Sequence, residues 1–496
     1  MPARAAWPLA LLCGVVSSLG FDPVDIPFAM VLGVAGLLAI ARALAEAPKR
    51  VVLATGAIFG LAFMGPLIWW MNAVSNGAYV ALVLAETLFF ALIMLALRAA
   101  CRLPAWPLWA ATVWVLGETV RGGFPFSGFP WGRLVHTAID TPFAPYARLI
   151  GMPATSAVLL VVAAMLVLLV TARSWRDRLL PVAVLAVLAG VGALLPTGVA
   201  DPSGTRQIAL VQGDVPGVFL TWERGEITKL HLAETQRLVD RVRRGEEPKP
   251  DAVLWPENAT DVDPFHAEGL RARIESLSSD LDAPILVGGI FDGDTVDTAK
   301  NAGVVWDADG PGQMYVKRKP VPYGEYVPFR TALGGLVPRF DRDIPRDMLP
   351  GEDPGALRIA DFTVGDTICW DIAYDGIVRE TVQEGAQVLV VQTSNASFTG
   401  TAQPEQQWEI SRLRAIETGR WVLVPSTNGI SGIADATGRA VSRAPLHEPT
   451  TLSAAVPLAG DLTPALRIGG WVELVLVLLG VVGWVLGART GRGGAD

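Results

Sequence analysis

The hydrophobic and polar positions divide the chain into two regimes. Long apolar runs follow one another, with short polar breaks, as far as residue 200. From 201 to 469, short apolar stretches alternate with polar ones, and a last apolar run lies near 470–487. A helix needs roughly 20 mostly apolar residues to cross a bilayer. The pattern predicts a transmembrane domain over 1–200, a water-exposed domain over 201–469, and a final span with a short tail over 470–496.

The apolar runs predict an α-helical membrane bundle of about eight spans. We interpret the first run as a retained span and not a signal peptide, because a second run follows at once and no convincing cleavage site separates them. The expected spans are at about 7–21, 26–45, 51–71, 78–100, 104–120, 155–172, 179–199 and 470–487.

Lysine and arginine in the short loops predict the orientation, because basic loops stay in the cytoplasm. The loops FDPVD and NAVSNG have no basic residue, whereas the alternate segments do. We therefore expect both termini in the cytoplasm and the domain at 201–469 on the outer face of a bacterial cytoplasmic membrane. The basic residues of the cytoplasmic segments are Arg4, Arg42, Lys49, Arg50, Arg98, Arg102, Arg173, Arg176, Arg178, Arg489 and Arg492.

The segment 121–154 is an exception to this charge pattern. It is expected outside, yet it contains Arg121, Arg133 and Arg148. Its many prolines, glycines and aromatic residues (RGGFPFSGFPWG) predict a structured loop at the membrane interface. Two carboxylates, Glu86 and Glu118, lie within apolar runs, and such residues are either functional or hydrogen-bonded between helices. We favour the second interpretation.

The water-exposed regime predicts an α/β domain, because strand-like and helix-like stretches alternate. Expected strands cover 206–212, 251–257, 284–290, 301–308, 362–371, 386–395 and 420–428, and expected helices cover 221–245, 375–384 and 404–418.

Composition narrows the function classes. The chain is 51% hydrophobic and 18% charged, whereas soluble domains have about 25% charged residues. A net charge of -8 without a basic stripe argues against nucleic-acid binding. The sequence contains no HExxH, CxxC or phosphate-binding loop, so we expect no metal and no cofactor.

Three polar residues follow apolar strands of the α/β domain, where such folds place their chemistry. They are Glu257, Lys317 and Cys369, the last being the single cysteine of this domain. Each has an ordinary alternative: a helix cap, a surface charge, and a small buried hydrophobe. Together they suggest a nucleophilic thiol with a base and a cation.

In this order the three residues resemble the Glu–Lys–Cys triad of the nitrilase superfamily, and most closely its membrane-bound branch, the apolipoprotein N-acyltransferases. The resemblance covers nearly the whole chain and implies an αββα sandwich for 201–469. The chain departs from the family at Trp370-Asp371, where Tyr-Glu is common, and at 396–400, where Trp-Phe-Gly is frequent. The matching motifs are Leu254–Glu257, Lys317 with Val321–Pro328, Ile368–Asp371, Thr393–Asn395, Ser426–Ile430, and Trp222.

The resemblance implies a role for each of these residues. Glu257 would be the general base, Lys317 would stabilise the oxyanion, and Cys369 would carry the acyl group as a thioester. The donor would be a membrane glycerophospholipid, and the acceptor the α-amino group of the diacylglyceryl-cysteine of an apolipoprotein. Supporting roles fall to Glu325, Trp370, Asp371 and Asn395, and substrate binding to Trp222, Tyr323 and Tyr326.

Three alternatives remain open from the sequence. A membrane-tethered amidase or other carbon–nitrogen hydrolase would share the triad and differ only in using water to resolve the thioester. A scaffold that anchors a partner glycosyltransferase would not need all three residues. A transporter would leave the domain at 201–469 unexplained.

Overall fold

The computed structural model describes residues 2–216, 223–330 and 344–490, and the chain forms two compact units. Residues 1–196 and 464–496 make up one unit, here called the helical unit, and residues 197–463 make up the other, the sandwich unit. The sequence placed its boundaries after 200 and 469, whereas the last helix begins at Pro464. Its first residues, PALRI, include Arg467. This charge lowers the local hydropathy, so the predicted apolar run begins only at 470.

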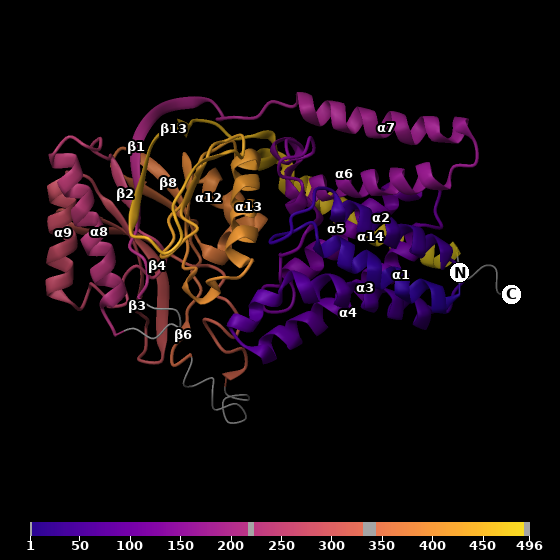
Figure 1. The fold of residues 1–496 in the computed structure, drawn as a ribbon, viewed down its shortest axis with the longest axis horizontal. Helices are drawn as coiled ribbons and strands as arrows, with labels where there is room; N and C mark the ends of the chain where they lie inside the picture. Colours follow the sequence, from indigo (N-terminus) through magenta and orange to yellow (C-terminus); the bar gives the residue numbers. More distant parts are fainter. Residues whose placement is uncertain (1, 217–222, 331–343, 491–496) are drawn as a thin grey trace. The chain divides into compact units, whose positions relative to one another are not determined.

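The helical unit contains one α-helix for each predicted apolar run (Figure 1). Five of them, α3, α4, α6, α7 and α14, are long and apolar enough to cross a membrane. The helices α1 and α2 are shorter, at 16 and 15 residues, so the count of eight spans stays a prediction. The bounds are α1 Ala3–Ser18, α2 Ala29–Ala43, α3 Lys49–Leu67, α4 Asn76–Ala100, α5 Trp106–Gly123, α6 Tyr146–Thr171, α7 Trp175–Leu194 and α14 Pro464–Thr490.

The carboxylates within the helices are paired, as the hydrogen-bonding interpretation predicted. Glu86 on α4 forms a 3.2 Å ion pair with Arg121 on α5, and both side chains are at most 2% exposed. Arg121 also donates to the carbonyls of Phe129 and Gly132. Glu118 accepts the Leu134 amide at 2.7 Å. The loop after α5 is therefore structured, and Arg121 departs from the charge pattern because a buried carboxylate balances it.

The described residues of the sandwich unit form two β-sheets. The first has the order β13-β1-β2-β3-β4-β5, with β6 beside β4, and the second has the order β12-β11-β10-β9-β8-β7. The strands of the first sheet are β1 Pro202–Gln212, β2 Ala252–Leu254, β3 Ile285–Asp292, β4 Thr298–Asp307, β5 Gly310–Val316, β6 Asp347–Met348 and β13 Thr450–Ala459. Those of the second are β7 Ala356–Ile359, β8 Phe362–Ile368, β9 Val388–Gln392, β10 Val422–Val424, β11 Gly432–Ala434 and β12 Ala440–Arg443.

Helices cover the outer face of each sheet. The helices α8 (Glu226–Arg243) and α9 (Glu268–Leu281) lie on the first sheet, and α12 (Asp375–Gln383) and α13 (Gln403–Thr418) on the second (Figure 1). Ile227, His231 and Leu238 of α8 are buried at the spacing of one helical face, which packs against the sheet. The α/β domain is confirmed, in the four-layer order that the resemblance implied.

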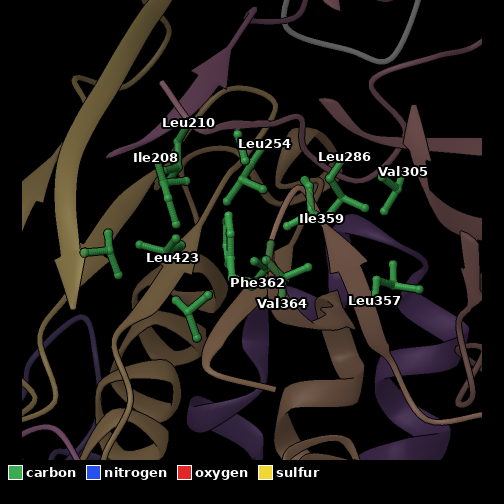
Figure 2. Close-up of a cluster of buried hydrophobic side chains, with 14 of the residues drawn as sticks. Ile208, Leu210, Leu254, Leu286, Val305, Leu357, Ile359, Phe362, Val364 and Leu423 are labelled. Carbon is green, nitrogen blue, oxygen red and sulfur yellow. The ribbon is translucent and has the colours of Figure 1, made fainter. Parts of the chain in front are cut away.

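The main core lies between the two sheets (Figure 2). Leu254 and Leu286 of the first sheet meet Phe362, Val364 and Leu423 of the second, and all five are buried. Alternate residues of a strand point to one face, so these side chains mark the inward face of each strand. The sequence missed α9, β6, β7 and the three strands β11–β13, which are short, polar, or paired with strands distant in sequence. Of β5 it identified only the end, next to Lys317.

Candidate active site

The ends of four strands bring the predicted residues to one place. The strand β2 is parallel to β3, while β4 is antiparallel to both β3 and β5, so β2 and β5 run in the same direction. Their carboxyl ends carry Glu257 and Lys317 at one edge of the first sheet. The parallel strands β8 and β9 end in Cys369 and the segment 393–395 at an edge of the second sheet.

Lys317 lies between two carboxylates. Its Nζ is 3.1 Å from Oε1 of Glu257 and 3.0 Å from Oε1 of Glu325, and the side chain is 2% exposed. Burial disfavours its charge, but the two carboxylates outweigh this effect and hold the pKa of Lys317 well above its usual value. Asn301 on β4 donates to the same two oxygens, at 2.7 and 2.8 Å. The site therefore holds a permanent ammonium group in fixed geometry.

The carboxylate of Glu257 is held from two sides. Oε1 faces Lys317 and Asn301, and Oε2 accepts the backbone N–H of Ser394 at 2.8 Å. Glu257 is buried, which removes competition from water. These contacts fix the orientation that a general base needs.

Cys369 is the first residue after β8 and has a left-handed backbone, with φ +51°. Residues other than glycine adopt this conformation rarely, and it costs about 1 kcal/mol or more, often at functional sites. Gln407 of α13 donates to the Cys369 carbonyl at 3.1 Å and steadies the turn.

The Cys369 thiol is close enough to Glu257 and Lys317 for both charges to act on it. Burial and then Glu257 raise the pKa of Cys369 to about 12, whereas Lys317 and the Thr393 hydroxyl oppose the shift. The resting group is therefore a thiol, and a base must take its proton during attack.

Asp371 ties the cysteine turn to the segment after Lys317. It accepts the Tyr315 hydroxyl at 2.6 Å and the amides of Arg318 and Lys319 at 3.3 and 3.0 Å. Burial raises the pKa of Asp371, and Lys317 with these three donors opposes the shift. The adjacent Trp370 donates its indole N–H to the Tyr374 hydroxyl at 2.8 Å. Both residues that depart from the family motif after Cys369 thus have definite partners.

The other predicted residues that the structure describes take part in hydrogen bonds that fix the backbone near the site. Asn395 donates to the Gly429 carbonyl at 2.7 Å, which joins the two Ser/Thr–Asn segments. Tyr323 and Tyr326 are half-buried and close a tight turn through the Tyr323 amide and the Tyr326 carbonyl, 2.8 Å apart. Glu325 fixes this turn through its second oxygen, which accepts the Val321 amide at 2.7 Å. Trp222 lies outside the described residues.

Sequence reasoning missed three residues of the site. Asn301, Tyr315 and Gln407 all donate to site residues, and all are buried. In the sequence, such residues can be recognised as polar side chains within an apolar strand or on an apolar helix face. Asn301 is one example, at the start of the apolar stretch NAGVVWDA.

One group of side chains among the described residues has the spacing of metal ligands: Asp263, His266 and Asp292. Asp292 also pairs with Arg346 at 2.7 Å, and two members of the group are exposed. None of the three contacts the triad.

Comparisons with known proteins match each of the two units to a known domain family. Residues 13–166 match the apolipoprotein N-acyltransferase N-terminal domain, and residues 227–460 match the carbon-nitrogen hydrolase family. The apolipoprotein N-acyltransferase of Mycolicibacterium smegmatis is 36% identical over 86% of this chain and 76% of its own length. That of Azotobacter vinelandii is 29% identical over 97% and 96%.

Among solved structures, an amidase from Nesterenkonia sp. is 17% identical, with a TM-score of 0.36 over 52% of this chain and 93% of its own. The likeness is distant, and the relatives in sequence carry the assignment. On their evidence, the chain belongs to the apolipoprotein N-acyltransferase family, a multi-pass membrane branch of the carbon–nitrogen hydrolases.

Proposed function

We propose that this enzyme transfers an acyl chain from a membrane glycerophospholipid, through a thioester on Cys369, to the α-amino group of the N-terminal diacylglyceryl-cysteine of an apolipoprotein. The observation that carries the proposal is the ammonium of Lys317 between Glu257 and Glu325, next to the Cys369 thiol. The name of the family supplies the lipoprotein acceptor.

In the first half-reaction the Cys369 sulfur attacks the ester carbonyl of the donor while Glu257 takes the thiol proton. Lys317 and the backbone N–H after Cys369 stabilise the negative oxygen of the tetrahedral intermediate. The C–O bond then breaks, and Glu257 returns the proton to the departing alcohol of the lysophospholipid. Because the pKa of Cys369 is about 12, proton removal accompanies the attack.

In the second half-reaction the amine of the acceptor loses a proton to Glu257 and attacks the thioester carbonyl. The C–S bond breaks, an amide forms, and the thiolate recovers its proton from Glu257. The cycle is ping-pong, and each step uses only these side chains.

Both proposed substrates carry lipid chains, which accounts for a hydrolase-like domain linked to membrane helices. The sandwich unit lies between α7 and α14 in the sequence, so membrane helices tether it at both ends. We place it on the outer face, with both termini in the cytoplasm, from the distribution of basic loops. An amidase acting on small soluble amides would gain nothing from this tether.

The test uses purified full-length protein in detergent with a phospholipid that carries a labelled acyl chain. Without acceptor, we expect hydroxylamine-sensitive label on the wild type and none on Cys369→Ala. A diacylglyceryl-cysteine peptide should then discharge the label as an amide. Discharge by water at the same rate would favour the amidase, and an unlabelled, folded wild type would favour the scaffold.

A further inference from the structure

A second carboxyl group lies inside the sandwich unit, close to the catalytic residues. Asp366 of β8 is between Val364 and Ile368 on the inward face of the strand, in the core between the sheets (Figure 2 labels Val364). Its side chain is 0% exposed, and neither carboxyl oxygen has a hydrogen-bond donor of good geometry among the described residues. A charged carboxylate in this position would be strongly unfavourable.

A second buried acceptor lies close by, on Gln392 at the end of the adjacent strand β9. Its Oε1 is also buried without a donor among the described residues. Both oxygens face Gly303 of β4: a Cβ at that position would lie 2.1 Å from Asp366 Oδ2 and 2.4 Å from Gln392 Oε1. Only glycine leaves this space open, so the fold provides room for two acceptor oxygens beside the same backbone position.

The orientation of the Gln392 amide is fixed by its other end. Its Nε2 donates to the carbonyl of Trp255 at 2.6 Å. Rotating the amide would put oxygen against oxygen at that carbonyl, so Oε1 is the atom beside Gly303, where Asp366 Oδ2 also lies. Two hydrogen-bond acceptors that meet in a dry core need a proton between them.

The charges around Asp366 favour that proton. Burial raises the pKa of Asp366 well above its usual value, and Asp371 and Glu257 raise it further. The adjacent Thr367 amide opposes the shift only in part. Gln392 also connects this carboxyl to the base, because Trp255 precedes Glu257 by two residues on the same segment.

We propose that Asp366 is a neutral carboxylic acid that donates its proton to Gln392 Oε1, and that this pair positions Glu257 through the Trp255 carbonyl. Asp366 is thus a positioning residue, three positions before the nucleophile on the same strand. Its effect on turnover rests on the role of Glu257 in the proposed function, whereas its protonation does not.

The test compares Asp366→Asn with Asp366→Leu in purified full-length protein. The asparagine amide can donate to Gln392 Oε1, so we expect the rate of acyl-enzyme formation to stay within about threefold, since a neutral hydrogen bond is kept. The leucine cannot donate, and we expect a loss of about tenfold to a hundredfold. Gln392→Leu should cause a similar loss, and the two leucine variants combined should lose little more than either alone.

An infrared measurement at the pH of the assay separates this proposal from the proposed function. Wild type should show the C=O stretch of a protonated carboxyl that Asp366→Asn lacks, whether or not the protein forms an acyl-enzyme. A carboxylate band in place of the acid band would overturn the proposal. A folded Asp366→Asn as slow as Gln392→Leu would also overturn it, even if Asp366→Leu does not fold.

Discussion

At the residue scale, the site depends on charges that are buried together. Lys317 keeps its proton because Glu257 and Glu325 face it, and Glu257 keeps its orientation because Lys317, Asn301 and the Ser394 amide hold it. Buried groups of this kind are sensitive to the loss of one partner, because the remaining partner is left without a counter-charge.

Glu325→Gln tests this dependence. The substitution removes one of the two carboxylates that face Lys317, so we expect acyl-enzyme formation to slow by about tenfold or more, the effect of losing a buried charge-assisted hydrogen bond. The matched control is Glu380→Gln, which breaks the 2.7 Å pair of Arg318 with a half-exposed glutamate. Exposed pairs contribute about 0–1 kcal/mol, so the control should be nearly unchanged. Equal effects of the two substitutions would contradict the role of Glu325.

The pH dependence of Cys369 alkylation tests the state of the thiol. Burial and Glu257 raise its pKa to about 12, so the reactive thiolate is scarce at neutral pH and grows with rising pH. In a Cys13→Ser/Cys101→Ser background, iodoacetamide should react more slowly at pH 8 than with a free cysteine, whose pKa is about 8.5. The rate should still rise beyond pH 10. A plateau near neutral pH would indicate a resting thiolate–ammonium pair instead.

At the scale of elements, the same segments carry chemistry and support. The strand β8 ends in the nucleophile, and Asp371 in the following turn holds the amides of the lysine segment. In the helical unit, Arg121 on α5 joins Glu86 of α4 to the carbonyls of the loop after α5. Single buried side chains thus fix whole segments.

Arg121→Met tests this support in the helical unit. The substitution leaves Glu86 buried without its 3.2 Å partner, so we expect a loss of about 3–5 kcal/mol in stability. Thermal unfolding in detergent measures the loss, and adding Glu86→Leu should restore part of it. Glu46→Gln serves as the control, because Glu46 is 90% exposed in its 3.9 Å contact with Arg102. A stable Arg121→Met variant would show that the pair is dispensable.

At the scale of the whole molecule, the chain inserts a hydrolase-like unit between membrane helices. Basic residues follow the second, fourth and sixth helices, and the loops after the first and third have none. This alternation predicts the side of the membrane on which the sandwich unit functions.

Cysteine accessibility tests this topology. In the Cys13→Ser/Cys101→Ser background, Val296→Cys places a thiol on an 88% exposed residue of the sandwich unit. A membrane-impermeant maleimide should label it in intact cells. Arg176→Cys, in the basic segment at the start of α7, should be labelled only after the membrane is opened. The reverse pattern would invert the proposed orientation.

The local sequence pattern predicted much of the secondary structure and pointed to the strand ends that carry Glu257, Lys317 and Cys369. Apolar runs identified the helices of the helical unit, because hydropathy is a local property. The sequence did not predict Asn301, Tyr315 and Gln407 as site residues, because each donates a hydrogen bond to a residue that is distant in sequence. The strand β13 was missed for the same reason, because it pairs with β1, which begins far away in the sequence at Pro202.

The two regimes, the α/β class and the types of residue available for catalysis follow from the amino-acid sequence, because hydropathy, spacing and motif are enough to predict them. The tertiary structure adds which charged groups lie in contact, which carboxyl is buried near Gln392, and why burial raises the pKa of Cys369. These properties depend on burial and on distances of a few ångströms between strands far apart in the chain, and electrostatic energies in a dry core vary steeply over such distances.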